Sequence, residues 1–235
     1  MDPAAKPGRI EAIYNEFKKT CFEFVKPEPA KDDDLLLVHT KNLINSVKRK
    51  GIYEIAGLSA GGAIKAAEIG LQDAAFALIR PPGHHAGKNF NGGFCYFNNM
   101  AVAVEKLIKG GKIGKALIVD IDLHYGNGTA DIFQGRKDVS ILDINSNTKE
   151  EYIKRLKDQL DTIKGYDIIG ISAGFDRYEL DWGGMFKTED YNTIGKIIKN
   201  KAYKNCNGKY FAVLEGGYYI PDLGKNVRSL IDGMT

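Results

Sequence analysis

One stretch of the chain, residues 116–129, constrains the fold and the function more than any other. It reads Ala-Leu-Ile-Val-Asp-Ile-Asp-Leu-His-Tyr-Gly-Asn-Gly-Thr. The apolar run 116–119 predicts a strand buried on both faces, as in parallel sheets. Asp120, Asp122 and His124 follow at alternate positions, and alternate side chains of an extended segment point to the same side. Two carboxylates and an imidazole that are buried together need a cation or hydrogen bonds to offset their lost hydration.

Two interpretations of this stretch are open from its residues alone. A divalent metal held by Asp122 and His124 would explain the crowding, and Gly126 and Gly128 would let the chain turn sharply afterwards. The alternative is an ordinary strand-to-helix loop with a helix-capping aspartate and a hydrogen-bonded histidine. The stretch itself does not decide between them.

The composition indicates a soluble globular protein. A chain of 235 residues suits a single α/β domain, which we expect to span residues 1–235. The net charge of +3 is too small to indicate direct binding to nucleic acid. Cys21, Cys95 and Cys206 show no CxxC spacing, which favours reduced thiols over disulfides or a cysteine-rich zinc site.

The chain shows no sign of membrane attachment or export. No apolar run approaches the ~20 residues of a membrane-spanning helix. The first residues carry charges and prolines where a secretory signal needs an apolar core. We therefore expect a cytoplasmic protein without a membrane partner.

Apolar runs and helical patterns alternate along most of the chain, which predicts a largely parallel sheet with helices on both faces. The expected strands are residues 74–79, 116–119, 139–142, 167–172 and 210–214. The expected helices are residues 9–24, 57–73, 100–108, 149–163, 188–198 and 223–231. Residues 31–34 read as a solvated loop or a helix start, and residues 35–47 fit either a strand or a helix.

Polar clusters follow four of the apolar runs. Because the carboxyl ends of parallel strands share one edge of a sheet, these clusters are expected to meet there. Asp122, His124 and Asp176 would give a metal two carboxylates and one nitrogen, with open positions for water and substrate. Zn²⁺ accepts such a set, and so does Fe²⁺ or another divalent ion. For Asp176 alone, the alternative is a loop or helix-capping residue.

His84 and His85 are adjacent and follow the stiff Pro81-Pro82 pair, which would fix their direction. One imidazole could accept a proton from water and the other could protonate a leaving amine. Asp120 would then orient an imidazole nitrogen without touching the metal. The alternative is a pair of solvent-exposed loop histidines.

Tyr218 follows Gly216-Gly217, so its phenol could approach the metal and donate to an oxyanion. A tyrosine after a strand is otherwise a core residue.

Taken in order, these segments resemble the histone deacetylase and acetylpolyamine amidohydrolase family, over roughly residues 35–235. The matching motifs are Arg80-Pro-Pro-Gly-His-His-Ala86, Gly92-Gly-Phe-Cys-Tyr-Phe-Asn-Asn99, Asp120-Ile-Asp-Leu-His-Tyr-Gly-Asn-Gly-Thr129, Ser172-Ala-Gly-Phe-Asp176 and Glu215-Gly-Gly-Tyr218. The resemblance implies an arginase/deacetylase fold, with three layers and a parallel eight-stranded sheet between helices.

The resemblance also implies roles for individual residues. The zinc ligands fall on Asp122, His124 and Asp176, the histidine pair on His84 and His85, and the transition-state tyrosine on Tyr218. Asp120 matches the carboxylate that hydrogen-bonds the first histidine, and backbone carbonyls beside it resemble a structural potassium site. Asn127 matches class II-like members, where class I members carry an aspartate beside the second histidine.

For the substrate, the resemblance implies an aromatic channel wall at Phe94 and a carbonyl acceptor at Gly93. A slender aliphatic chain packs well between flat apolar surfaces. Trp182 stands near the rim, where many relatives carry Leu or Pro.

Two further departures from the family bear on the site. The family's opening strand is expected to be missing before residue 3. Only residues 144–151 stand where a long Gly-rich loop normally adds the second channel wall. The site could therefore be shallower and more open, or a second copy of the chain could close it in a homo-oligomer.

These observations favour a zinc-dependent deacylase that hydrolyses the acetyl amide of a lysine side chain or an acetylpolyamine. A catalytically weak or inactive protein that binds acylated amines is the alternative from another class. A ureohydrolase needs a second manganese shell, and His39, His84, His85 and His124 leave few ligands for it.

Overall fold

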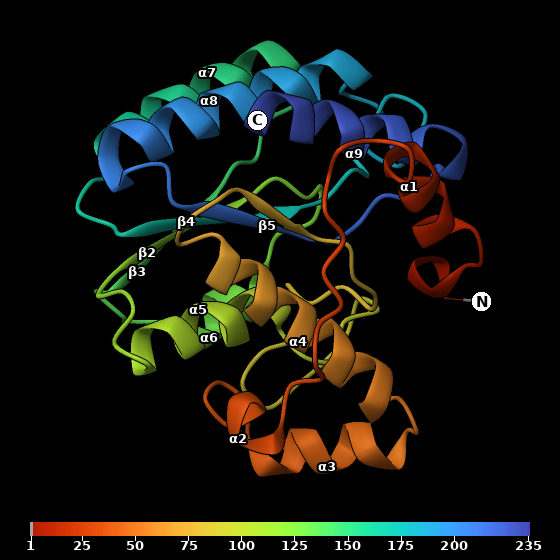
Figure 1. The fold of residues 1–235 in the computed structure, drawn as a ribbon, viewed down its shortest axis with the longest axis vertical. Coiled ribbons are helices and arrows are strands. Elements are labelled where there is room, and N and C mark those ends of the chain that lie inside the picture. The colour runs from red at the N-terminus through yellow and green to blue at the C-terminus, as the bar shows by residue number, and fades with distance from the viewer. Residues whose placement is uncertain (1) are drawn as a thin grey trace.

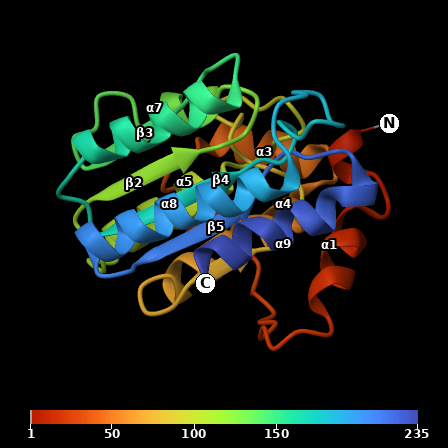
Figure 2. The ribbon, with the colours of Figure 1, turned by 90° about the horizontal axis from the view of Figure 1, so that it is seen from above.

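A parallel five-stranded sheet lies at the centre of the computed structural model, which describes residues 2–235 (Figure 1). Its strand order is β1-β5-β4-β2-β3, and every neighbouring pair is parallel. The strands are β1 (Ala75–Ala77), β2 (Ala116–Asp120), β3 (Val139–Asp143), β4 (Ile168–Ala173) and β5 (Tyr210–Leu214). All five carboxyl ends therefore lie on one side of the molecule, to which the arrows of β2 and β5 point in Figure 2.

Helices cover both faces of the sheet (Figure 1). One layer holds α7 (Lys149–Thr162), α8 (Thr188–Cys206) and α9 (Ile220–Met234), with α1 (Arg9–Phe17) packed against α9. The other layer holds α4 (Tyr53–Ile69), α5 (Asn99–Lys109) and α6 (Asn127–Ile132), and beyond it lie α2 (Asp32–Leu35) and α3 (Lys41–Arg49). A short 3₁₀ turn spans Pro3–Ala5. Among residues 2–235, no helix is long and apolar enough to cross a membrane.

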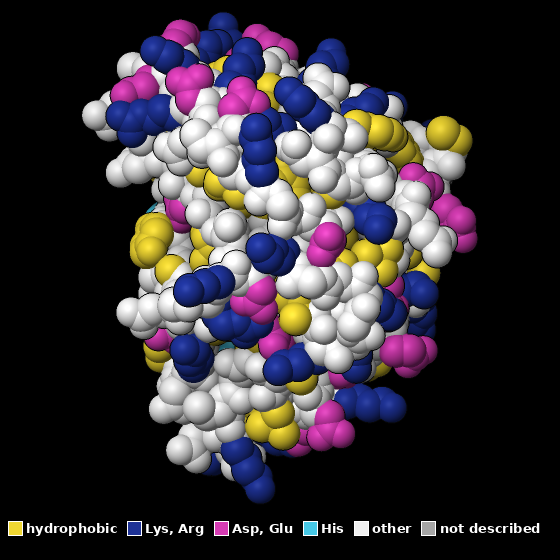
Figure 3. All heavy atoms as spheres, turned by 90° about the vertical axis from the view of Figure 1, so that its left-hand side faces the viewer, with side chains coloured by type: hydrophobic (Ala, Val, Ile, Leu, Met, Phe, Trp, Pro, Cys, Tyr) yellow, Lys and Arg dark blue, Asp and Glu magenta, His cyan; other side chains and the backbone are white. Residues whose placement is uncertain are grey.

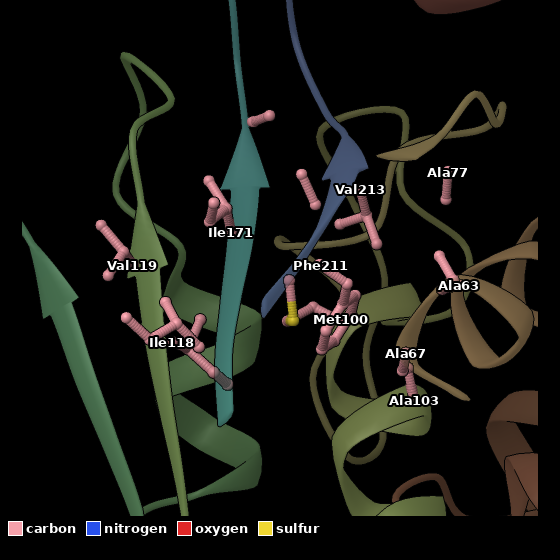
Figure 4. Packing of buried hydrophobic residues seen from close by; sticks show 14 of the residues in the cluster. Ala63, Ala67, Ala77, Met100, Ala103, Ile118, Val119, Ile171, Phe211 and Val213 are labelled. Atoms are coloured by element: carbon pink, nitrogen blue, oxygen red, sulfur yellow. The ribbon is translucent and has the colours of Figure 1, made fainter. Parts of the chain in front are cut away.

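The core forms where the apolar runs of the sheet meet the helices, as Figure 4 shows. Every residue of β2, β4 and β5 is buried, which explains their near-continuous apolar sequences. Met100 of α5 packs directly on β4, where a Cβ at Gly170 would lie 2.5 Å from its sulfur. The central strands are thus held rigidly, and so are the ends that carry the polar clusters.

All five predicted strands are confirmed, each within a few residues of its expected bounds. The eight strands that the family resemblance implied are not found in residues 2–235, which form five. The reason is that the segment before β1 forms helices and connections, and each later apolar run supplies a single strand.

The helix expected over residues 9–24 was predicted too long, because α1 ends at Phe17. Thr20 Oγ1 donates to the Phe17 carbonyl, and the chain then folds back. Phe22 meets the ring of Phe17 edge-on, with 5.6 Å between centroids. Packing of these aromatic side chains therefore replaces further helical turns.

Other boundaries also differ from the sequence prediction. Of the ambiguous residues 35–47, Leu35 ends α2 and residues 41–47 belong to α3, which Thr40 caps by accepting from the Leu43 N–H. The helix expected at residues 57–73 is α4, which begins and ends four residues earlier. It packs closely on its neighbour, as predicted: a Cβ at Gly61 would lie 1.9 Å from the Glu28 carbonyl oxygen.

Gly126 and Gly128 lead into a helix as well as a turn, because α6 starts at Asn127. Gly128 lies against the backbone of the histidine pair, where a Cβ would come within 2.5 Å of the His85 carbonyl carbon. The absence of a side chain at Gly128 thus lets α6 approach the candidate site.

On the face shown in Figure 3, basic and acidic side chains are interspersed with scattered hydrophobic ones. The face lies at the amino ends of the strands, opposite the polar clusters. Its mixed charge agrees with the net charge of +3 and gives no support for a nucleic-acid partner there.

A buried histidine joins the outer helices to the segment that carries the histidine pair. His39 is 4% exposed, and its Nε2 accepts from the Asn98 N–H at 2.9 Å. Its Nδ1 must then carry the proton, which it donates to the Gly87 carbonyl at 2.9 Å. Asn98 in turn caps α5 and donates to the Ala86 carbonyl. A second proton on His39 would sit on Nε2, and it would break the hydrogen bond that Nε2 accepts from the Asn98 N–H.

We predict that His39 makes the protein acid-sensitive. Burial lowers the pKa of His39 to about 4, whereas an unfolded histidine titrates near 6.5. The unfolded chain therefore binds the extra proton first, and stability present above pH 6.5 is lost as the pH falls toward 4. Relative to a His39→Gln variant, the wild type should lose about 3 kcal/mol across this window. Urea unfolding at pH 7 and pH 4 measures this difference, and parallel pH profiles would contradict the prediction.

Candidate metal centre and active site

Asp122, His124 and Asp176 come together at the carboxyl edge of the sheet, in the loops after β2 and β4. One ligand atom from each lies within 4.8 Å of the others. His124 Nδ1 is 2.9 Å from Asp176 Oδ2 and 3.2 Å from Asp122 Oδ1. Both carboxylates are buried, whereas the His124 side chain is 41% exposed. The structure thus brings together the three residues that the sequence predicted as metal ligands.

The surroundings of these ligands fit a divalent cation. Backbone N–H groups bind some of the carboxylate oxygens: Gly216 donates to Asp122 Oδ2 at 2.8 Å, and Leu123 donates to Asp176 Oδ1 at 3.0 Å. Asp176 Oδ2 is fully buried and accepts no hydrogen bond. Such an orphaned charged oxygen is costly without a cation. A donor set of one nitrogen and two carboxylates suits Zn²⁺, Fe²⁺ and related ions.

The electrostatics of the cluster also indicate a missing positive charge. Burial and the neighbouring Asp122 raise the pKa of Asp176 to about 6. The hydrogen bond of His124 to Asp122 and the close carboxylate of Asp176 raise the pKa of His124 to about 10. Without a metal, protonated His124 is thus the only one of the three residues whose positive charge offsets the negative charge of the two buried carboxylates. A cation would take over that role and leave the imidazole neutral for coordination.

The histidine pair lies beside this cluster, with 4.1 Å between the two ring centroids. His84 Nδ1 is 3.0 Å from Asp120 Oδ2, and His85 Nδ1 is 2.7 Å from Asn127 Oδ1. His84 is only 3% exposed, so the alternative of two solvent-exposed loop histidines is wrong for it. Asp120 Oδ2 lies against His84, while its Oδ1 accepts from the backbone N–H of Asp122 at 3.0 Å and is not one of the three clustered ligand atoms.

The two histidines differ in charge. Burial alone would lower the pKa of His84, but Asp122 and Asp120 outweigh it and raise the pKa well above its ordinary value. Burial, together with His84, lowers the pKa of His85. His84 therefore favours the protonated state and His85 the neutral state.

Aromatic side chains surround Tyr218 at the mouth of the site. The Trp182 ring stacks on Tyr218, with 4.2 Å between centroids and 28° between planes. Phe94 meets Tyr218 edge-on at 6.3 Å. Gly93 lies against His85, where a Cβ would come within 2.3 Å of the imidazole Cδ2. All three residues expected to contact substrate thus border the histidine pair and Tyr218.

Tyr218 is held as a neutral phenol. Burial raises its pKa, and Asp122 and Asp176 raise it further. Arg9 is fully buried beneath the segment before Tyr218, where its Nε donates to the Gly217 carbonyl at 2.8 Å. The guanidinium carbon lies 5.6 Å from the Tyr218 ring centroid. The sequence analysis assigned no function to Arg9, and nothing in its local sequence distinguishes it.

The loop from Arg177 to Phe186 contains two supporting residues that the sequence analysis missed. Arg177 Nε donates to the Asp122 carbonyl, and its Nη2 donates to the Ile144 carbonyl, both at 3.0 Å. Asp181 Oδ2 accepts from the backbone N–H groups of Tyr218 and Tyr219 at 2.5 and 2.7 Å. Their position within five residues of a predicted ligand, Asp176, is the one signal that could have identified them.

The connection after β3 is as short as the sequence indicated, since only residues 144–148 separate β3 from α7. The rim nearby is open: Trp182 is 53% exposed and Tyr125 is 63% exposed. Within residues 2–235, both of these side chains are therefore more than half exposed.

Comparisons with known proteins agree with this geometry. The Histone deacetylase domain family profile matches residues 3–152, which include the histidine pair and two of the three candidate metal ligands, Asp122 and His124. The chain belongs to the histone deacetylase domain family. This membership confirms the resemblance seen in the motifs.

Individual relatives of this histone deacetylase domain support the assignment over the rest of the chain. A probable deacetylase of Methanothermobacter thermautotrophicus is 30% identical, over 97% of this chain and 84% of that protein. Acetylpolyamine amidohydrolase of Mycoplana ramosa is 34% identical, over 79% of this chain. That match spans 64% of the Mycoplana ramosa protein, somewhat under two thirds of its length.

The fold of the histone deacetylase domain is also shared with a solved structure. The crystal structure of the HDA15 HD domain superposes with a TM-score of 0.87, over 98% of this chain and 82% of that one. Its sequence identity of 24% makes this a likeness of fold. The alignment with the Methanothermobacter relative extends over 283 positions, so that protein carries insertions relative to these 235 residues.

We predict that Asp176→Ala lowers the metal content of the protein from about one divalent ion per chain to near zero. The substitution removes the orphaned oxygen and leaves only two ligands. Asp158→Ala, at an exposed position of α7, should keep the wild-type content. Metal analysis after dialysis against trace Zn²⁺ measures this, and full retention of the ion in Asp176→Ala would exclude these ligands.

A second prediction concerns Asp181 and uses the sole tryptophan as a probe. Asp181→Ala removes the acceptor that holds the Tyr218 backbone, so the stack of Trp182 on Tyr218 should loosen. Fluorescence anisotropy of Trp182 should fall, while the metal content stays unchanged. Glu179→Ala, an exposed position in the same loop, serves as the control. Equal anisotropy in the two variants would show that Asp181 does not hold Tyr218.

Proposed function

We propose that this protein is a divalent-metal-dependent amidohydrolase that removes acetyl or related acyl groups from primary amines. The substrate class that we favour is an acetylated lysine side chain or an acetylpolyamine. Membership of the histone deacetylase domain family supports the reaction type. The relatives include proteins named for acetylpolyamine and for histone substrates, which supports this pair of substrate classes.

The proposal rests on one structural observation. The orphaned Asp176 Oδ2 points into a cluster with Asp122 and His124, and the histidine pair and Tyr218 border the same cluster. A loop or capping aspartate would not need this arrangement, because its oxygens would be satisfied by backbone N–H groups. A divalent cation, Zn²⁺ or Fe²⁺, would supply Lewis acidity to a substrate carbonyl and to water.

The two imidazoles divide the proton transfers. His85 Nδ1 faces the Asn127 side-chain oxygen at 2.7 Å, so it carries a proton and leaves Nε2 with the free lone pair. His85 Nε2 is therefore the general base toward the attacking water. His84 is held by Asp120 on one side and lies 3.8 Å from Asp122 on the other, which stabilises its positive charge. His84 thus supports the site electrostatically and can hold the proton that the leaving amine takes up.

Tyr218 supplies the hydrogen bond to the developing oxyanion. Its high pKa keeps the phenol protonated, and Asp181 and Arg9 hold its backbone segment from two sides. Phe94 and Trp182 flank the ring and would pack along the methylene chain of the acylated amine. The Gly93 carbonyl is our candidate acceptor for the substrate amide. A monovalent cation such as K⁺ near Asp120 remains a prediction from the family resemblance.

The short connection after β3 favours a second candidate function, an inactive protein that binds acylated amines. An open rim contacts less of the substrate, which weakens both binding and the exclusion of water. A ureohydrolase is disfavoured because His39, the remaining histidine, uses both ring nitrogens in hydrogen bonds to the Gly87 carbonyl and the Asn98 N–H.

We expect Tyr218→Phe to lower kcat about 10²- to 10³-fold, because the oxyanion loses its phenolic donor. The metal content should not change, since Tyr218 is not a ligand. Tyr219→Phe removes a hydroxyl from the next residue and should keep wild-type kcat. Hydrolysis of a fluorogenic acetyl-lysine peptide measures the effect, and full turnover by Tyr218→Phe would remove this role.

The substrate class is tested by assaying acetyl-lysine peptide, acetylpolyamines and longer acyl-amides with Zn²⁺ and Fe²⁺ in turn. Hydrolysis of at least one acyl-amide, lost on chelation and restored by the ion, is the expected result. Tight binding of the acylated amines without turnover would favour the inactive binding protein.

A further inference from the structure

A second group of metal-binding side chains lies deeper than the first. His84, Cys95 and Glu215 each offer a ligand atom, and the three atoms lie within 4.8 Å of one another. All three residues are buried. The metal centre described above uses none of their atoms, so this cluster requires its own explanation.

Each of the three residues keeps a donor atom free for a ligand. Glu215 Oε2 accepts from the backbone N–H groups of Gly83 and His84, but Glu215 Oε1 is buried without a partner. The Cys95 sulfur makes only a weak hydrogen bond to the Gly93 carbonyl, at 3.4 Å. His84 uses Nδ1 for Asp120, which leaves Nε2 available. The orphaned Glu215 oxygen independently marks this cluster as incomplete.

The chemistry of the set differs from that of the first centre. It combines a nitrogen, a sulfur and an oxygen, and a thiolate ligand favours Zn²⁺ and softer ions such as Cd²⁺. A tetrahedral zinc shell with bonds of about 2.0–2.3 Å places neighbouring ligand atoms roughly 3.5 Å apart. The side chains would therefore have to move together by up to about 1 Å. The surrounding Asp120 and Asp122 carboxylates provide a negative environment for the incoming ion.

We propose that His84, Cys95 and Glu215 form a second metal site, specific for thiophilic divalent ions, directly beside the candidate catalytic centre. Binding forms one metal–sulfur, one metal–nitrogen and one metal–oxygen bond, and both the thiol proton of Cys95 and the Nε2 proton of the His84 imidazolium leave to solvent. His84 Nε2 is 3.8 Å from Asp122 Oδ1, so the two sites adjoin. Repulsion between the two ions makes the second site the weaker one.

Occupation of this site would inhibit the enzyme. The ion would replace the proton on His84 Nε2, so that His84 could no longer hold a proton for the leaving amine. This consequence rests on the proposed function, whereas the binding of the ion does not. The site would thus let the protein lose activity when the concentration of free zinc rises.

Cobalt provides a test that does not depend on activity. The first centre has only oxygen and nitrogen ligands, so a thiolate-to-cobalt charge-transfer band in the near ultraviolet reports on the second site. The full chain is prepared with Cys21→Ser, because Cys21 is exposed and could bind cobalt itself. We expect the band to develop with the second equivalent of Co²⁺ and not with the first.

Matched variants assign the band. Cys95→Ser keeps the size of the side chain but removes the sulfur, and should abolish the band. Cys206→Ser alters the other buried cysteine and should leave the band unchanged. Glu215→Gln keeps an oxygen for the Gly83 and His84 N–H groups and removes the charge, and should raise the cobalt concentration for half-saturation at least tenfold.

Several results would overturn the proposal. The first is absence of the cobalt band in the parent protein at excess Co²⁺, and the second is persistence of the band in Cys95→Ser. The third is a Glu215→Gln variant with the same cobalt half-saturation as the parent protein. This third result would count even if Cys95→Ser failed to fold. For the inhibitory role, Cys95→Ser should need at least tenfold more excess Zn²⁺ for half-inhibition of acyl-amide hydrolysis. Equal inhibition would refute that role while a cobalt band would still establish the site. An inactive protein that shows the band would refute only the proposed function.

Discussion

The site depends on two buried carboxylates, Asp122 and Asp176, that lie too close together to be stable without a positive charge. The parallel sheet imposes this arrangement, because β2 and β4 are neighbours and both end at the same edge. The backbone approaches so closely that a Cβ at Gly174 would lie 2.2 Å from Asp122 Oδ2. A side chain at position 174 would therefore displace Asp122, and under the proposed function a divalent cation would supply the positive charge.

Much of the remaining site holds these groups in place. Arg177 binds the backbone of the β2 loop, and Asp181 binds the backbone before α9. Both belong to the segment that follows Asp176, so a single loop connects Asp176, the backbone of Asp122 and the backbone of Tyr218. Under the proposed function, a displacement of this loop would disturb metal binding and oxyanion stabilisation together. This coupling explains why buried Arg177 and half-buried Asp181 bind backbone groups beside the site.

The sequence predicted the structure best where a pattern of apolar and polar residues is compatible with only one kind of element. The apolar runs of β2, β4 and β5 are buried on both faces, so they could be predicted as strands and their polar ends as one cluster. The clustering of Asp122, His124 and Asp176 could be predicted because these residues follow two parallel strands that end at the same edge of the sheet. The end of α1 could not, because it depends on Phe22 folding back onto Phe17, a contact that helical periodicity does not encode. The contact of Arg9 with the site could not be predicted either, because Arg9 donates to the carbonyl of Gly217, which lies near the other end of the chain.

The aromatic rim is built by residues outside the short connection between β3 and α7. Trp182 of the Arg177–Phe186 loop stacks on Tyr218, and Phe94 meets the same ring edge-on. Because Trp182 remains 53% exposed, its outer part is free to contact the amine carrier beyond the acyl group. A flat, electron-rich ring in that position favours a cationic carrier through cation–π attraction. Under the proposed function, this exposed aromatic surface would therefore contribute to recognition of the amine carrier.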